Sequence, residues 1–301
     1  MDIKTKILAL KKEKNAIILV HNYQIPEVQD VADAVGDSLG LSIQAAKTDA
    51  DVIVFCGVHF MAETAKILSP AKTVLIPDKN AGCPMADMIN ADQLRALKKA
   101  HPGARAMCYV NTTAEVKAEC DLCCTSANAM KIVNAVFKPE EEVIFVPDKY
   151  LAHYIATKTG RNFIYWRGFC PTHARILPED IDRQRRLHPQ AEVLAHPECT
   201  PGVLEKADMV LSTEGICRRA NEGSAREYII ATETGMLYRL GKENPDKIFY
   251  AASERAVCPN MKLTTLEKVL WSLQEMTHEV TVPEDVMDRA RVSIRRMLEY
   301  V

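Results

Sequence analysis

Short apolar runs recur along the chain, and each of them ends in polar residues. They lie at 16–23, 106–112 and 191–198, then at 52–57, 143–148 and 228–233, and finally at 73–76, 162–166 and 247–251. A strand that is buried on both faces of a parallel sheet has such a short and nearly continuous apolar sequence. The pattern therefore predicts buried parallel strands in three groups, with polar side chains at the strand ends.

Helical patterns alternate with these runs. They cover 43–48, 61–68, 91–100, 127–136, 151–159, 179–187 and 234–240. In each group a small hydroxyl residue stands where a helical stretch opens, namely Ser38, Ser126 and Thr213, the last preceded by Ser212. Alternating strands and helices are typical of α/β proteins with right-handed crossover connections. We therefore expect each group to form a short parallel sheet of four strands.

A repeat in the cysteine positions organises these groups. Cys83, Cys170 and Cys258 are each followed by proline, 87 and then 88 residues apart. The apolar runs precede each cysteine at similar distances, which is the signature of an internal repeat. The sequence thus predicts an α/β fold of three αβα units, 1–84, 85–171 and 172–259, related by a pseudo-threefold axis around a central cluster site.

The segment 260–301 lies outside the repeat. Helical patterns cover 265–276 and 284–298, and the residues between them, 278–283, read as an extended link. We expect this segment to be a C-terminal helical extension that packs on the three units.

The composition is typical of a globular protein and indicates neither a nucleic-acid partner nor a membrane partner. Of 301 residues, 48% are hydrophobic and 26% are charged, as in ordinary globular proteins, and the net charge of −2 gives no general attraction to nucleic acid. The first residues are charged rather than apolar, and no apolar run approaches the ~20 residues of a membrane helix. The sequence therefore predicts a cytoplasmic protein with neither a nucleic-acid partner nor a membrane partner.

Ten cysteines are many for such a chain, and a reducing cytoplasm disfavours disulfides. Most of them are interpreted as buried thiols, but the three repeated ones should meet at one point, because sites in α/β sheets lie at the carboxyl ends of the strands. A [4Fe-4S] cluster normally takes four thiolates, so three would leave one iron open as a Lewis acid. Core thiols at equivalent positions are the alternative. Zinc is disfavoured because the closely spaced pairs of zinc sites are missing.

A second group of cysteines offers an alternative redox or metal site. Cys120, Cys123 and Cys124 include a C-x-x-C spacing that is typical of redox or metal pairs. The last two fall on a predicted buried strand, which favours structural roles. A redox sensor or metal-binding protein built on these three thiols remains a hypothesis.

Several motifs together resemble the quinolinate synthase family over essentially the whole chain. They are HNYQ at 21–24, GDS at 36–38, FMAE at 60–63, YVN at 109–111, TSAN at 125–128, CPTH at 170–173, HPEC at 196–199, TE at 232–233 and VC at 257–258. The chain departs from the family pattern at Glu214, where a small residue is expected, and over 218–224. These departures leave local loop details open.

The resemblance implies an enzyme that condenses iminoaspartate with dihydroxyacetone phosphate to quinolinate, releasing phosphate and water, in de novo NAD biosynthesis. It implies one [4Fe-4S] cluster per chain on Cys83, Cys170 and Cys258. Iminoaspartate is unstable, so an aspartate oxidase or dehydrogenase is the expected pathway partner. A hydro-lyase that uses the same open iron on another hydroxy acid is the alternative enzyme.

Further site residues are expected near the cluster. His21 and His196 stand at equivalent strand ends, and Tyr23 and Glu198 lie two residues beyond them, on the same side of an extended segment. We expect His21, Tyr23 and Glu198 to be catalytic, with Glu198 as general base and Tyr23 in proton transfer. Residues expected to bind substrate are His21, Ser38, Tyr109, Asn111, Ser126, His196, Glu198, Ser212 and Thr213. His173 is interpreted either as a supporting group or as a helix-start residue.

Overall fold

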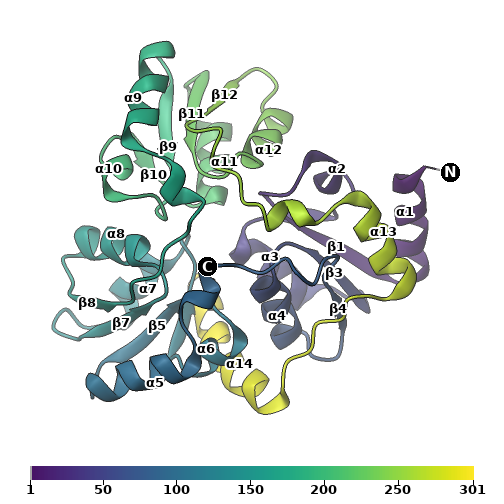
Figure 1. Ribbon diagram of the computed structural model, residues 1–301, viewed down its shortest axis with the longest axis horizontal. Helices are drawn as coiled ribbons and strands as arrows, with labels where there is room; N and C mark the ends of the chain where they lie inside the picture. Colours follow the sequence, from purple (N-terminus) through teal and green to yellow (C-terminus); the bar gives the residue numbers. More distant parts are fainter. Residues whose placement is uncertain (1) are drawn as a thin grey trace.

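Three parallel sheets surround the centre of the molecule in the computed structural model, which describes residues 2–301 (Figure 1). The first has the order β2 (Ala34–Gly36), β1 (Ala16–His21), β3 (Val52–Cys56), β4 (Thr73–Leu75). The second has the order β6 (Leu122–Cys124), β5 (Arg105–Tyr109), β7 (Val143–Val146), β8 (Phe163–Tyr165). The third has the order β10 (Met209–Val210), β9 (Glu192–Ala195), β11 (Glu227–Ala231), β12 (Ile248–Ala251). The expected α/β fold of three αβα units with four-stranded parallel sheets is confirmed.

Helices flank each sheet. Unit one carries α1 (Ile3–Glu13), α2 (Pro26–Gln29), α3 (Ser38–Lys47) and α4 (His59–Leu68). Unit two carries α5 (Ala91–Ala100), α6 (Ala114–Ala118), α7 (Ala129–Val136) and α8 (Lys149–Thr159). Unit three carries α9 (Pro178–Leu187), α10 (Pro201–Leu204), α11 (Thr213–Glu222) and α12 (Met236–Glu243). Short 3-10 helices follow the three Cys-Pro pairs, at η1 (Ala86–Met88), η2 (His173–Arg175) and η3 (Met261–Leu263).

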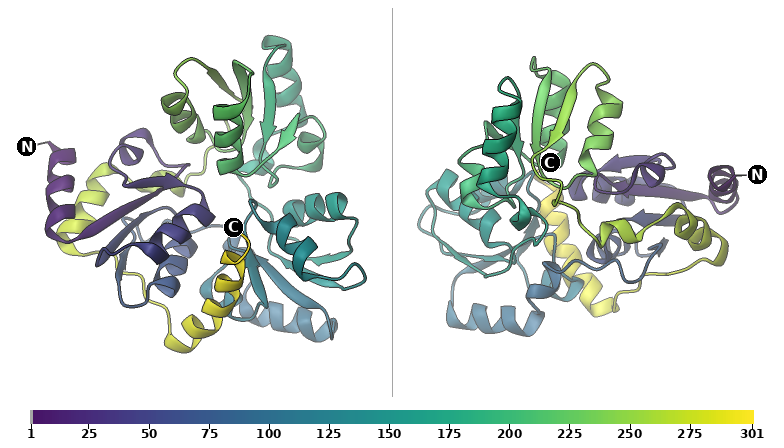
Figure 2. Two further views of the ribbon diagram at one scale, coloured as in Figure 1. Left: turned by 180° about the vertical axis from the view of Figure 1, so that it is seen from behind. Right: turned by 45° about the horizontal axis from the view of Figure 1, so that its top comes forward.

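The C-terminal segment contributes two helices that pack on different units. Helix α13 (Leu266–Glu275) lies against α1, whereas α14 (Glu284–Leu298) lies against α4, α6 and β6 (Figure 2). The link between them is extended, as expected, and runs antiparallel beside β4, where Val280 donates its N–H to the carbonyl of Val74. The link therefore lies along the β4 edge of the first sheet, and α14 joins units one and two.

Units one and two share a hydrophobic core, whereas unit three has cores of its own. One core runs from Phe55 in β3 through Phe145 in β7 to Ile294 in α14, so units one and two share it. The third sheet has a core on each face, one including Val193 and the other Leu194. Unit three thus forms a body of its own beside the joined pair of units one and two.

No helix within residues 2–301 combines the length and apolar character that spanning a lipid bilayer requires.

Candidate active site

A cavity of about 180 Å³ lies where the carboxyl ends of the strands converge. Of the site residues expected from the sequence, those that line it are His21, Tyr23, Ser38, Cys83, Tyr109, Asn111, Ser126, Cys170, His196, Glu198, Thr213 and Cys258. Ser212 does not line the cavity, because its hydroxyl caps α11 by accepting the N–H of Gly215 at 3.1 Å. Residues that are far apart in the sequence are thus gathered from all three units.

The three repeated cysteines occupy the same local setting. Each precedes a 3-10 helix by three residues, so that backbone N–H groups of the turn face its thiol; those of Met85 and Ala86 face Cys83. Burial raises the pKa of all three thiols, that of Cys83 to about 12. A bare thiolate is therefore disfavoured, while the N–H groups that face each sulfur suit a thiolate bound to a metal.

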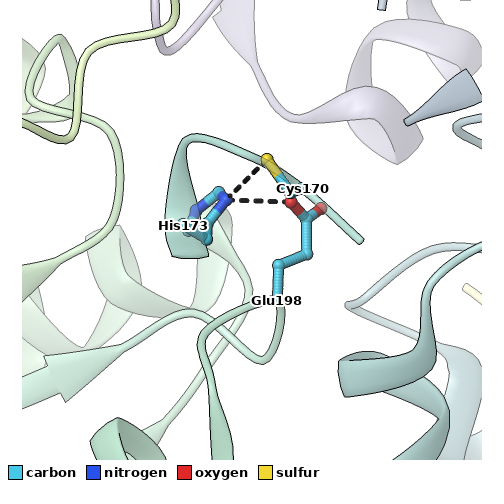
Figure 3. A group of neighbouring side chains, drawn as sticks. All are labelled: Cys170, His173 and Glu198. Atoms are coloured by element: carbon cyan, nitrogen blue, oxygen red, sulfur yellow. Dashed lines mark hydrogen bonds and ion pairs between the residues drawn. The ribbon is translucent and has the colours of Figure 1, made fainter. Parts of the chain in front are cut away.

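A histidine and a carboxylate stand beside one of these thiols (Figure 3). His173 Nδ1 lies 3.2 Å from Cys170 Sγ and 2.9 Å from Glu198 Oε2. The three potential ligand atoms lie within 4.8 Å of one another, so this part of the cavity can hold a metal ion. His173, for which the sequence left two interpretations open, begins η2 and is also fully buried within the site.

A chain of hydrogen bonds leads away from Glu198. His173 Nε2 lies 2.8 Å from Thr232 Oγ1, and the Tyr23 hydroxyl lies 2.7 Å from that same oxygen. On the other side, the Tyr109 hydroxyl donates to Glu198 Oε1. Tyr23, Thr232, His173, Glu198 and Tyr109 therefore form one continuous polar network through the site.

The network holds Glu198 in its charged form. Burial by itself raises the pKa of a carboxyl group, but the neighbouring His173 and the hydrogen bond from Tyr109 outweigh it and lower the pKa of Glu198 below its ordinary value. Burial raises the pKa of the Tyr23 and Tyr109 hydroxyls, and the charge of Glu198 adds to the effect. The tyrosines are therefore neutral donors around a charged acceptor.

The two equivalent histidines are also neutral. Burial lowers the pKa of His21 and of His196 to about 3. In both, Nδ1 accepts the backbone N–H two residues further on, that of Tyr23 at 3.2 Å and that of Glu198 at 3.4 Å. The ring proton must then be on Nε2, which in His196 lies 3.1 Å from Ser126 Oγ. Each histidine thus presents a neutral N–H donor.

The hydroxyl residues differ in their settings. Ser38 and Thr213 are the first residues of α3 and α11, as expected. Ser126 does not open its helix, because Asn128 accepts the N–H of Thr125 and so forms a turn first; α7 begins at Ala129. All three hydroxyl residues nevertheless line the cavity.

Some lining residues carry chemistry that the sequence analysis did not single out. Arg175, in η2, is exposed and is the one arginine or lysine among the residues that line the cavity. Thr232, which directly follows β11 and belongs to the TE motif at 232–233, is not among the lining residues, but its hydroxyl joins Tyr23 to His173. Asn111 was expected, and its Oδ1 is buried without a hydrogen-bond partner among residues 2–301. An unpaired buried acceptor at a cavity wall suits a ligand donor.

The second group of cysteines lies outside the cavity lining. Cys120, Cys123 and Cys124 are not among the residues that line the cavity. Cys123 Sγ lies 3.4 Å from Cys108 Sγ on the neighbouring strand, and burial raises the pKa of both thiols. Protonated buried thiols are poor nucleophiles, so the burial of Cys123 and Cys124 favours structural roles for these two residues.

Comparison with known proteins gives consistent matches over nearly the whole chain. The family model described as quinolinate synthetase A protein matches residues 5–299. The quinolinate synthase of Dehalococcoides mccartyi strain BAV1 is 56% identical over 299 residues, which cover 99% of this chain and 98% of the relative. That of Thermodesulfovibrio yellowstonii is 56% identical over 98% of this chain and 97% of the relative. Quinolinate synthase 1 of Methanosarcina acetivorans is 54% identical over 99% and 97%.

Proposed function

The chain belongs to the quinolinate synthetase A family, and on that premise we propose that it condenses iminoaspartate with dihydroxyacetone phosphate to quinolinate, releasing phosphate and water. This reaction would supply de novo NAD biosynthesis. The observation that carries the proposal is the convergence of Cys83, Cys170 and Cys258, from three units, on one cavity lined by neutral hydrogen-bond donors.

We propose that these three cysteines hold one [4Fe-4S] cluster per chain. The donor set fits the group: the thiols are free, line one cavity, and each is faced by a backbone N–H of its own turn. When bound, such a cluster supplies an iron without a protein ligand, which acts as a Lewis acid towards a substrate oxygen or nitrogen.

The remaining lining residues suit anionic substrates. Helices α3 and α11 begin at Ser38 and Thr213, where the helix dipole and free N–H groups favour carboxylate or phosphate. The Nε2–H groups of His21 and His196 add neutral donors. The unpaired Oδ1 of Asn111 would accept from a substrate N–H or O–H, and Arg175 would attract the phosphorylated substrate to the cavity.

Proton transfer is proposed to run through the polar network. Because Glu198 accepts from His173 Nδ1, the acceptor of that imidazole is Nε2, which faces the Thr232 hydroxyl. As Tyr23 takes up a proton from the substrate, its own proton can pass through Thr232 to His173, and Glu198 stabilises the imidazolium that forms. A carboxylate with a lowered pKa is a weak base by itself. Glu198 would therefore act as general base through His173.

Two proposals concern the setting of the reaction. Iminoaspartate is unstable in water, so an aspartate oxidase or dehydrogenase would have to supply it close by. We place the reaction in the cytoplasm, because free thiols and a labile cluster require a reducing compartment.

The test is to purify the protein without oxygen, to count iron and acid-labile sulfide, and to supply both substrates. We expect about four of each per chain and formation of quinolinate. A full cluster without quinolinate would overturn the reaction, and a screen of hydroxy acids would then test the hydro-lyase alternative.

A second candidate rests on the group formed by Cys170, His173 and Glu198. Their ligand atoms are close enough to hold a single divalent ion, as in a mononuclear metal enzyme. That alternative predicts one zinc per chain and no labile sulfide. A sensor built on Cys120, Cys123 and Cys124 instead predicts that metal content depends on those thiols.

A further inference from the structure

Arg239, on α12, does not line the cavity, but two of its three bonded partners directly follow lining residues in the chain. Its guanidinium pairs with the Glu214 carboxylate through NH1 at 2.8 Å and NH2 at 3.1 Å, and its Nε donates to Glu243 at 2.7 Å. NH1 also donates to Oδ1 of Asn22 at 2.9 Å. Glu214 is the position where the family pattern leads us to expect a small residue, so this ion pair gives the departure a structural role.

Asn22 connects Arg239 to the cavity wall. It is fully buried after β1, between His21 and Tyr23, and its Nδ2 donates to Thr213 Oγ1 at 3.0 Å. The oxygen and nitrogen of an amide have the same shape, so only its partners decide its orientation. A guanidinium can only donate, which requires Oδ1 to face Arg239 and Nδ2 to face Thr213.

The orientation of this amide decides what Thr213 offers to a ligand. Because Thr213 Oγ1 accepts from Asn22, its own proton is free, and the side chain lines the cavity. If the amide were reversed, Thr213 would donate to Asn22 Oδ1 and would present only lone pairs to the cavity. A hydroxyl that donates attracts a carboxylate or phosphate, whereas one that presents lone pairs repels it.

We propose that Arg239 is a positioning residue that fixes the Asn22 amide, so that Thr213 donates its hydroxyl proton to an anionic group of the substrate. The inference rests on the proposed function for the identity of that anion. It makes the Arg239–Glu214 ion pair of unit three, which reaches unit one through Asn22, a determinant of substrate affinity.

The test measures binding of quinolinate, a dicarboxylate, to the anaerobic holoenzyme by isothermal titration calorimetry. Arg239→Met removes the donors and keeps an apolar stem, and we expect the dissociation constant to rise about tenfold, with unchanged iron content. Asn22→Asp keeps the contact with Arg239 but can only accept, so Thr213 must donate to it; a similar rise is expected. Thr213→Val removes the hydroxyl itself.

The double variant separates positioning from a general structural effect. If Arg239 acts through Thr213, adding Arg239→Met to Thr213→Val changes the dissociation constant by less than about twofold. If the two effects multiply, the inference is wrong. It is equally overturned if Arg239→Met alone binds quinolinate like the unaltered chain.

Lys242→Met is the matched control. Lys242 lies on the same helix, and among the described residues its ammonium pairs with Asp30 of unit one and not with Asn22. We expect its dissociation constant to stay at the unaltered value. Formation of quinolinate by the unaltered chain tests the proposed function separately, so that the two ideas can fail independently.

Discussion

At the scale of single residues, the site is built from groups whose protonation states are fixed by burial. His21 and His196 are almost completely buried, and burial lowers the pKa of each to about 3. Neither imidazole is charged at neutral pH. In the proposed function, each would therefore offer a hydrogen bond to a substrate without bringing a cation close to the proposed open iron.

This burial makes stability depend on pH. The unfolded chain takes up a proton on His196 below about pH 6.5, whereas the folded chain does so only near pH 3. Stability is thus complete above pH 6.5 and falls as the pH drops, by about 1.4 kcal/mol per pH unit and per histidine. We expect His196→Asn to make the loss of unfolding free energy between pH 6 and pH 5 smaller by about 1.4 kcal/mol.

Urea unfolding at pH 7, 6 and 5 measures this slope. The same substitution at His153, which is exposed on α8, serves as the control for removing a histidine from the surface. An identical slope in His196→Asn and the unaltered chain would mean that His196 is protonated alike in the folded and unfolded states.

Thr232 gives a second prediction at this scale, because its hydroxyl joins Tyr23 to His173. Thr232→Val keeps the shape and removes the hydroxyl, so we expect kcat for quinolinate formation to fall about a hundredfold, as for loss of general acid–base catalysis. KM and iron content should change little.

Thr232→Ser restores the hydroxyl and should recover most of the rate. Steady-state kinetics on both variants checks the prediction. If Thr232→Val kept the rate of the unaltered chain, proton transfer would have to follow another route.

At the scale of elements, the C-terminal helix α14 joins two units. It packs against α4 of unit one and against α6 and β6 of unit two. Ile294 and Met297 on its inner face are fully buried in the core that these units share. The helix therefore acts as a core element and not as an appendage.

Ile294→Ala tests this role. Removing a fully buried side chain from a shared core should lower the free energy of unfolding by roughly 2–4 kcal/mol. Val292→Ala, on the exposed side of the same helix, should change it by less than about 0.5 kcal/mol. Chemical denaturation of both variants makes the comparison. If Ile294→Ala lowered the free energy of unfolding as little as Val292→Ala, α14 would contribute little to the core.

The elements that the sequence predicted well are those with strong periodic patterns. The helices expected at 91–100 and 284–298 are present as α5 and α14 with the same bounds. Helix α1 was not expected, because it is rich in lysine and buries only Ile7 completely. Helices α2, α6 and α10 are about one turn long, too short for an apolar stripe to appear in the sequence.

At the scale of the whole molecule, three repeated units meet at one centre, and the cysteine spacing together with the matching apolar runs was enough to predict it. The repeat predicted that Cys83, Cys170 and Cys258 converge, because equivalent positions in units around one axis face that axis. The bonds that join units were not predictable. Asn22–Thr213 and Tyr23–Thr232 link residues 191 and 209 positions apart, and no local pattern encodes such pairs. The unit boundaries at 84, 171 and 259 remain a prediction.

The convergence of the three cysteines also predicts how much metal is lost when one of them is replaced. If each thiol served its own unit, replacing one would remove at most a third of the metal. If all three hold a single cluster, then Cys83→Ala, Cys170→Ala and Cys258→Ala should each reduce iron and sulfide from about four per chain to nearly none. Cys124→Ala, a buried thiol of unit two outside the cavity, is the matched control and should keep both. Iron and sulfide analysis of the four variants, purified without oxygen, decides between these outcomes. Retention of most of the iron in any one of the three cysteine variants would exclude a shared cluster, because each unit contributes a single thiol to it.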